Sequence, residues 1–241
     1  MPNADKGQSM RYETDGYLRR IAAKVIATSE GAIALDDTVF YPAGGGQPGD
    51  TGMLEFADGR HIRIVDTRRA SWDPRVILHV PEFPVDITAG ADVVAEIDWD
   101  RRHLHMRMHT CLHLLCAVVD APVTSCSIGA DKGRLDFDLP EPTLDRDEVT
   151  ERLANLIARR IPVTTRTVTA EELRGLPKLV RSRSVAPPVF DGRVRVVDIA
   201  GVDMQACGGT HVADTGEIGT VRCVKIEKKS QHNRRVVVEF D

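Results

Sequence analysis

Residues 100–119 read DRRHLHMRMHTCLHLLCAVV, a stretch without glycine or proline that ends shortly before Pro122. Its apolar side chains recur every three to four positions, which predicts an α-helix with one apolar stripe. The stripe consists of Leu104, Met108, Cys111, Leu112, Leu115 and Val118 or Val119. Asp98 or Asp100 is expected to cap the start of the helix. The helix separates a strand-rich first part of the chain from a mixed second part.

The helix also carries four of the chain's eight histidines, which are His103, His105, His109 and His113. His109 and His113 are four residues apart, so their imidazoles lie one helical turn apart on the same face, which suits the binding of one metal ion. At about 100° per residue, this face points away from the apolar stripe. Two interpretations of the pair are open at this point, a metal site and a purely structural role.

A second pair of metal-binding side chains follows much later in the chain, in Cys207-Gly-Gly-Thr-His211. Its two glycines permit a tight loop, in which the thiol and the imidazole can bind one ion. With the helix pair they form a set of three imidazoles and one thiol, which suits tetrahedral Zn²⁺. Cys116 and His105 are competing ligands on the helix. We prefer Cys207 and His211 because the loop glycines have no other evident role, and we predict one zinc ion per chain.

Several enzyme classes lack their motifs in this sequence. His-Glu-x-x-His proteases need a glutamate after the first histidine as general base, and that position is Thr110 here. No Gly-x-Ser-x-Gly elbow is present, so a serine acyl-enzyme is not expected. The two metal-binding pairs are also too far apart in sequence for a zinc finger.

Residues 1–98 contain short apolar runs separated by glycine, proline and aspartate, which predicts a small barrel or bent sheet. The runs are Tyr17–Ile26, Ala32–Leu35, Val39–Tyr41, His61–Val65, Val76–Val80 and Val93–Trp99. Between them, the segment Asp37–Gly52 contains Gly44, Gly45 and Gly46, which can adopt positive φ and let backbone amides approach a ligand. A bulged hairpin is the simpler interpretation. Without a Gly-Lys-Ser/Thr ending, the segment is not expected to bind a nucleoside triphosphate.

The rest of the chain predicts mixed α and β structure. A helix is expected over Asp145–Arg160, and Thr169-Ala-Glu-Glu172 is a possible capping box for a short helix. Strands are expected over 133–139, 193–199, 218–227 and 234–240.

Composition limits the protein's class and partners. The chain has 241 residues, 42% hydrophobic and 28% charged, with no apolar run near the roughly 18 residues that span a bilayer. Its first residues lack the apolar core of a signal peptide, and its five cysteines are an odd number, so we expect a cytoplasmic protein without a disulfide framework or a membrane partner. The net charge is −4. Residues 1–98 are the more acidic part, so residues 99–241 are the better candidate for a polyanionic partner.

Three motifs together carry a resemblance to a known family. They are Phe40-Tyr-Pro-Ala-Gly-Gly-Gly-Gln47, Met106–Leu115, and Cys207-Gly-Gly-Thr-His-Val212 followed by Thr215-Gly-Glu-Ile-Gly219. With them, about residues 17–240 resemble the editing domain of alanyl-tRNA synthetase and its free-standing relatives, the AlaX trans-editing proteins of the medium-sized class. Threonyl-tRNA synthetase editing domains share the metal pattern, but the last motif resembles the alanyl branch.

The resemblance implies an aminoacyl-tRNA ester hydrolase. Its partner is the acceptor end of alanine tRNA carrying a wrong amino acid, chiefly serine, with glycine second. The implied fold is α+β, with a small N-terminal β-barrel-like domain, 1–98, followed by a mixed α/β zinc-containing editing domain, 99–241. The implied zinc ligands are His109, His113, Cys207 and His211.

The resemblance also implies substrate contacts. Thr110 corresponds to a pocket threonine, and Gln47 with Gly44, Gly45 and Gly46 lies near the substrate. We expect Thr110 and Gln47 to contact the serine hydroxyl group. The zinc ion has two possible roles, activating a water and positioning the substrate, and we favour the second. Cys111 and Leu112 depart from the small or polar residues usual between the two histidines.

Basic residues are expected to contact the tRNA backbone. They are Arg101, Arg102 and Arg107 near the helix, Lys178, Arg181 and Arg183 in a connecting loop, and Lys225, Lys228, Lys229, Arg234 and Arg235 near the C-terminus. Two alternative functions stay open. One is a zinc-stapled RNA-binding module without activity, and the other is a zinc hydrolase for another aminoacyl-tRNA, such as a threonyl-type substrate.

Overall fold

The computed structural model describes residues 8–140, 144–175 and 192–241, which form two compact units. The first unit comprises the residues up to Gly44 together with Pro48–His103. The second comprises Gly45–Gln47 and Leu104–Asp241. The division thus falls inside the helix predicted over 100–119, and three residues of the glycine segment group with the second unit. Among the described residues, no helix has the length and apolar character needed to cross a membrane.

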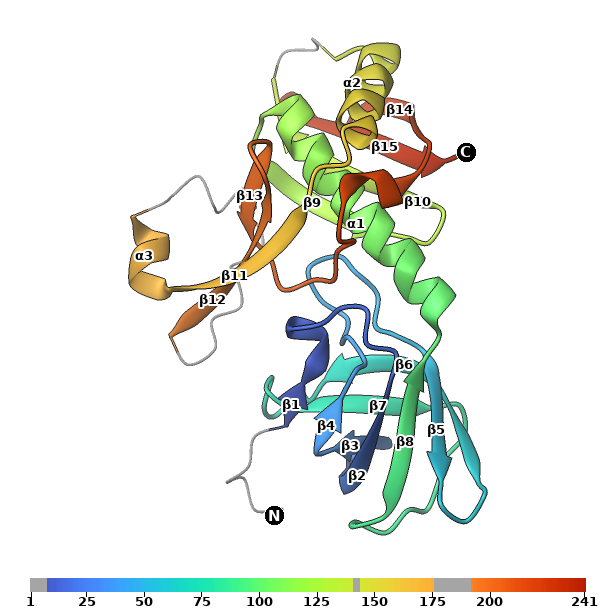
Figure 1. The fold of residues 1–241 in the computed structure, drawn as a ribbon. Helices are drawn as coiled ribbons and strands as arrows, with labels where there is room; N and C mark the ends of the chain where they lie inside the picture. Colours follow the sequence, from blue (N-terminus) through green and yellow to red (C-terminus); the bar gives the residue numbers. More distant parts are fainter. Residues whose placement is uncertain (1–7, 141–143, 176–191) are drawn as a thin grey trace. The chain divides into compact units, whose positions relative to one another are not determined.

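The first unit is built on a closed six-strand barrel, as the sequence predicted (Figure 1). Neighbouring strands are antiparallel in the order β2-β3-β7-β6-β5-β8. The barrel strands are β2 (Arg20–Ser29), β3 (Ala32–Leu35), β5 (Gly52–Phe56), β6 (His61–Arg69), β7 (Ile77–Pro81) and β8 (Asp92–Ile97). The short strand β1 (Ser9–Met10) leads into a 3-10 turn, η1 (Arg11–Glu13), and pairs in parallel with β4 (Asp37–Thr38).

Alternation of buried and accessible side chains explains the barrel strands. Along β5 and β8, every second residue is buried in the barrel core, which includes Leu35, Leu54, Ile64, Ala95 and Ile97. In the barrel unit one predicted strand is absent and one barrel strand was not predicted. Val39–Tyr41 forms no strand, and β5 was missed because it directly follows the glycine segment. Position 52 in β5 requires glycine, because a Cβ there would clash with the Glu96 carbonyl oxygen at 2.1 Å.

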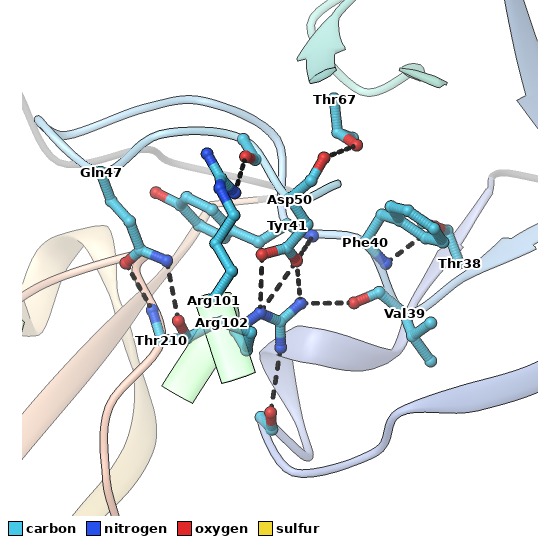
Figure 2. Close-up of polar contacts among 12 residues, drawn as sticks. Thr38, Val39, Phe40, Tyr41, Gln47, Asp50, Thr67, Arg101, Arg102 and Thr210 are labelled. Atoms are coloured by element: carbon cyan, nitrogen blue, oxygen red, sulfur yellow. Dashed lines mark hydrogen bonds and ion pairs between the residues drawn. The ribbon is translucent and has the colours of Figure 1, made fainter. Parts of the chain in front are cut away.

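A buried ion pair lies within the first unit, at the base of the glycine segment (Figure 2). The Arg102 side chain is fully buried, and its guanidinium binds the carboxylate of Asp50, whose side chain is 2% exposed. The same guanidinium donates to the carbonyl oxygens of Val39 at 2.6 Å and Gly16 at 2.9 Å. The Asp50 carboxylate also accepts from Tyr41 N at 2.6 Å. Arg102 is therefore committed to the fold, and its predicted role as a tRNA contact is wrong.

His79 is a fully buried imidazole in β7, held between two partners. Its Nδ1 lies 2.9 Å from the Ile33 carbonyl oxygen, which can only accept, so Nδ1 carries the proton. Its Nε2 lies 2.8 Å from the Thr38 hydroxyl. Burial lowers the pKa of His79 from 6.5 to about 4.

We therefore expect acid to destabilise the first unit. Between pH 6.5 and 4, His79 is protonated in the unfolded chain but stays neutral in the folded state. The free energy of unfolding therefore decreases as the pH is lowered, by about 3 kcal/mol from pH 6.5 to pH 4. His79→Gln keeps a donor and an acceptor without titrating. Urea unfolding of both proteins across this pH range should show a shallower pH dependence for the variant. Equal slopes would contradict the assignment.

The second unit contains the long helix α1 (Trp99–Val119) from Leu104 onward and a four-stranded antiparallel sheet (Figure 1). In the order β14-β15-β10-β9, the strands are β14 (Val221–Lys228), β15 (Asn233–Phe240), β10 (Lys132–Asp138) and β9 (Val123–Ile128). Gly133 lets α1 approach β10, since a Cβ there would lie 2.8 Å from the Met108 side chain.

The apolar stripe predicted on α1 is confirmed as buried, and the face that carries the histidine pair is buried too. The stripe residues Met108 and Leu112 are buried, but so are His109 and His113 on the other face. A helix covered on both faces cannot be recognised from one apolar stripe, because polar groups on its second face are buried by partners far away in sequence.

The remaining elements complete the second unit. A three-stranded sheet has the order β11-β12-β13, from β11 (Val163–Thr169), β12 (Arg193–Ile199) and β13 (Asp203–Ala206). Helix α2 (Arg146–Ala158) is capped by Asp145, and the predicted capping box of Thr169 and Glu172 is confirmed at α3 (Ala170–Arg174). The predicted strand Arg193–Ile199 is β12. A 3-10 turn, η3 (Thr215–Ile218), precedes β14.

Candidate metal centre

Four side chains of the second unit converge to form a group that could hold one metal ion. His109 and His113 come from α1, and Cys207 and His211 come from the loop after β13. One potential ligand atom from each lies within 4.8 Å of all the others. The Cys207 Sγ lies 3.5 Å from His109 Nε2 and 3.4 Å from His211 Nε2. The competing residues Cys116 and His105 are not part of this group.

Strand β12 shapes the loop that carries Cys207. The Arg195 guanidinium donates to the carbonyl oxygens of Cys207 at 3.0 Å and Gly209 at 2.7 Å, and Cys207 N donates to Arg195 O. Gly209 N in turn lies 3.4 Å from the Cys207 Sγ. A Cβ on Gly209 would lie 2.2 Å from His109 Cε1, so the close approach of this loop to α1 requires glycine.

Hydrogen bonds at Nδ1 fix the ring orientation of the three imidazoles. His113 Nδ1 lies 3.2 Å from the Asp203 carboxylate, which accepts. His211 Nδ1 lies 3.1 Å from Thr110 Oγ1, whose own proton goes to the Met106 carbonyl oxygen at 3.0 Å. Thr110 Oγ1 therefore accepts from the ring.

His109 follows the same pattern. Its Nδ1 lies 2.9 Å from Gln47 Oε1, which also accepts from Thr210 N at 3.2 Å. Because a backbone N–H can only donate, the amide orientation of Gln47 is fixed, and His109 Nδ1 must be the donor. All three rings thus carry their proton on Nδ1 when neutral, which leaves Nε2 free to bind a cation. Such outer hydrogen bonds are typical of metal-binding histidines.

The local electrostatics favour the metal-binding forms of Cys207 and His211, whereas His113 must lose a proton to bind a metal ion. Burial raises the pKa of the Cys207 thiol, but the His109 and His211 imidazoles outweigh it and hold the pKa well below its usual range. Burial, together with His109, lowers the pKa of His211 well below its usual range. Burial alone would lower the pKa of His113, but hydrogen bonds to Asp203 and Cys207 raise it to about 9. A thiolate and neutral imidazoles are the forms that bind metals.

The residues predicted to touch the substrate lie in or next to this centre. Thr110 and Gln47 are buried, and their polar groups hydrogen-bond to imidazoles and backbone as described above. Gly45 and Gly46 have φ of 57° and 84° and lie against β9, where Ile128 N donates to Gly46 O at 2.9 Å. A Cβ on Gly46 would lie 2.4 Å from the Cys126 Sγ. Gly44, in contrast, groups with the first unit.

Most of the predicted tRNA-binding arginines contact the protein itself. Arg234 is 4% exposed and donates to Pro140, Ser230 and Asn233 carbonyl oxygens, so its predicted phosphate contact is wrong. Arg107 donates to Ile218 O and lies over the Phe240 ring. Arg235 pairs with Asp136, and Arg101 donates to Gly49 O at 2.7 Å.

The predicted lysines are placed differently. Lys228 and Lys229 are exposed, and both Lys225 and Lys229 pair with Glu227. Lys178, Arg181 and Arg183 lie outside the described residues.

Sequence reasoning missed Asp203 and Arg195. Asp203 accepts from His113, and Arg195 holds the Cys207 loop. A carboxylate four residues before Cys207 was the available signal for Asp203. Nothing in the sequence pattern distinguishes Arg195 from the other arginines.

Comparison with family models first defines a class of protein. Residues 194–237 match the model described as "Threonyl and Alanyl tRNA synthetase second additional domain". Residues 15–101 match the model described as "tRNA synthetases class II (A)". The barrel unit and the metal-centre unit are therefore related to parts of tRNA synthetases.

Full-length relatives narrow this class to a family. The chain is 38% identical over 236 residues to the alanyl-tRNA editing protein AlaX-M of Methanosarcina barkeri. The matched region covers 93% of this chain and 96% of the relative. It is 32% identical to AlaX-M of Saccharolobus solfataricus, over 93% and 95% of the two chains. The alanine–tRNA ligase of Pyrobaculum calidifontis is 36% identical over 89% of this chain but only 25% of its own length. The chain belongs to the AlaX-M family of alanyl-tRNA editing proteins.

Proposed function

We propose that this chain is a zinc-dependent hydrolase that deacylates mischarged alanine tRNA in trans, with seryl-tRNA(Ala) as main substrate and glycyl-tRNA(Ala) as second. Its relatives are named as alanyl-tRNA editing proteins, which supports the reaction and the tRNA partner. The observation that carries the proposal is the convergence of one thiol and three imidazoles. The Nδ1 atom of each imidazole is already hydrogen-bonded to an acceptor.

The donor set fits zinc in chemistry and in spacing. Imidazole nitrogen and thiolate sulfur are its preferred ligands, at about 2.0 and 2.3 Å. Around a tetrahedral ion, those bond lengths separate sulfur from nitrogen by about 3.5 Å. The Cys207 Sγ lies 3.5 and 3.4 Å from the Nε2 atoms of His109 and His211.

The chain's own residues divide the work of such a site. Zinc held by His109, His113, Cys207 and His211 would supply positive charge beside the ester, and it would polarise the carbonyl group by expanding its coordination from the four protein ligands. Thr110, Gln47 and Asp203 orient the rings. The segment Gly45–Gln47, preceded by Gly44, is proposed to line the substrate end, where backbone amides stabilise developing negative charge.

A panel of charged tRNAs tests this proposal. We expect seryl-tRNA(Ala) to be hydrolysed at least about 100-fold faster than alanyl-tRNA(Ala), because a site that hydrogen-bonds a substrate hydroxyl strongly rejects the analogue without it. Glycyl-tRNA(Ala) should react more slowly than the seryl substrate. Binding without hydrolysis of any ester would indicate an RNA-binding module. Preferential hydrolysis of seryl-tRNA(Thr) would indicate a threonyl-type enzyme.

For the tRNA backbone, we propose the exposed lysines at the end of β14, Lys228 and Lys229, as phosphate contacts. Replacing both with alanine should weaken tRNA binding and reduce the slope of log affinity against log salt by about 2, because two phosphate contacts are lost. Lys24→Ala, an exposed lysine of the first unit, is the matched control and should leave the slope unchanged. A double variant with the wild-type slope would remove these lysines from the proposed surface.

A further inference from the structure

Gln47 is the residue of the glycine segment that contacts the metal centre, and its side chain is 2% exposed. Its Oε1 accepts from His109 Nδ1 at 2.9 Å and from Thr210 N at 3.2 Å. Its Nε2 donates to Thr210 Oγ1 at 2.8 Å. Both acceptor sites of the amide oxygen are therefore occupied, and one N–H is the remaining hydrogen-bonding capacity of the side chain.

We infer that Gln47 is a positioning residue for His109, which fixes the tautomer and ring orientation needed to bind the metal and does not contact the serine hydroxyl. This inference rests on the proposed function, because it assigns a role within the same metal centre. It replaces the expectation, drawn from the resemblance, that Gln47 recognises the substrate.

The packing around Gly209 supports this role. A Cβ at Gly209 would lie 2.5 Å from His109 Nδ1 and 3.0 Å from Gln47 Oε1. The imidazole, the amide and the loop backbone thus share one tightly filled space. A ring held in this way cannot rotate without breaking its bond to Gln47, so Nε2 keeps its direction before any ion arrives.

The hydrogen bond also has an electronic consequence. An acceptor at Nδ1 selects the Nδ1–H tautomer, leaves the lone pair on Nε2, and makes the ring a better donor to a metal. Loss of such an outer partner typically lowers metal affinity by about 10–100-fold. Gln47 further ties the segment Gly45–Gln47 to Thr210, one residue before His211.

Two substitutions separate positioning from substrate recognition. Gln47→Met keeps the length and burial of the side chain but removes every hydrogen bond. Gln47→Glu keeps an acceptor for His109 and for Thr210 N, and the Thr210 hydroxyl can turn to donate. Gln8→Met is the matched control, since Gln8 also bonds to backbone groups, those of Leu35 and Ile77, but lies in the first unit, whereas the candidate metal group lies in the second.

The main readout is Zn²⁺ affinity, measured by competition with a chromophoric chelator, with circular dichroism to confirm folding. We expect about 10–100-fold weaker zinc binding for Gln47→Met, and affinities within about threefold of wild type for Gln47→Glu and Gln8→Met. Gln47→Met with wild-type zinc affinity and lost preference for seryl over alanyl esters would overturn the inference in favour of a substrate contact.

A second readout does not depend on zinc or on activity. Ring ¹⁵N shifts of metal-free protein report the His109 tautomer, which should be Nδ1–H in wild type and a mixture in Gln47→Met. Unchanged shifts in the variant would contradict the positioning role. If wild-type protein bound no zinc, the proposed function would fail, while this tautomer measurement would still decide the role of Gln47.

Discussion

Cys207→Ala is expected to lose the bound zinc and to lower hydrolysis of seryl-tRNA(Ala) by about 1,000-fold or more. Cys207 Sγ lies within 3.5 Å of two imidazole nitrogens, so its removal leaves three neutral ligands without the negative charge that offsets the ion. Metal polarisation in an active site contributes several kcal/mol to transition-state stabilisation, and about 4 kcal/mol corresponds to this factor. Zinc content and single-turnover deacylation rates measure both effects.

Cys223→Ala provides the control for this experiment. Cys223 is also a free thiol and is buried, but it lies in β14 and outside the candidate metal group. We expect it to keep zinc and activity. Full deacylation by Cys207→Ala would rule out a metal-dependent site built on this thiol, and equal losses in both variants would point to general destabilisation.

The second large effect is expected at the buried ion pair of the first unit. Arg102→Met should lower the free energy of unfolding by about 3–5 kcal/mol, because the Asp50 carboxylate then stays buried with the Tyr41 N–H as its remaining described partner. The carbonyl oxygens of Val39 and Gly16 also lose their donor. Urea unfolding monitored by circular dichroism measures this loss.

Two further variants serve as controls for the expected loss of stability in Arg102→Met. Arg102→Met combined with Asp50→Leu should recover part of the loss, since the unpaired charge is gone. Recovery stays incomplete because the backbone partners remain unsatisfied. Asp92→Asn, which breaks the exposed pair with Lys24, should cost no more than about 1 kcal/mol. A similar small cost for Arg102→Met would show that water reaches the pair.

The sequence predicted those elements whose pattern lies within the element itself, such as a helical period or a capping box. The 3.6-residue period predicted α1, and Thr169 with Glu172 predicted the cap of α3. Burial of both faces of α1 could not be predicted, because the partners that cover His109 and His113 come from residues 47 and 203–211. Strand β5 was missed for a related reason, since its first residue, Gly52, belongs to the glycine segment in sequence but to the barrel in space.

The candidate site shows the same division. Residue type and spacing pointed to all four members of the metal group, because each pair places two metal-binding side chains four residues apart, where they can bind one ion. The acceptors at Nδ1 depend on how α1 meets β13 and the glycine segment, which spacing does not encode. Charge alone also misassigned Arg234, because burial against backbone carbonyls is a property of the folded hairpin.

X-ray absorption at the zinc edge, on purified protein whose deacylation of seryl-tRNA(Ala) is measured in parallel, tests the central claim most directly. We predict one zinc ion per chain with one sulfur at about 2.3 Å and three nitrogens at about 2.0 Å. Protein that carries no stoichiometric zinc and still hydrolyses seryl-tRNA(Ala) at the normal rate would contradict it.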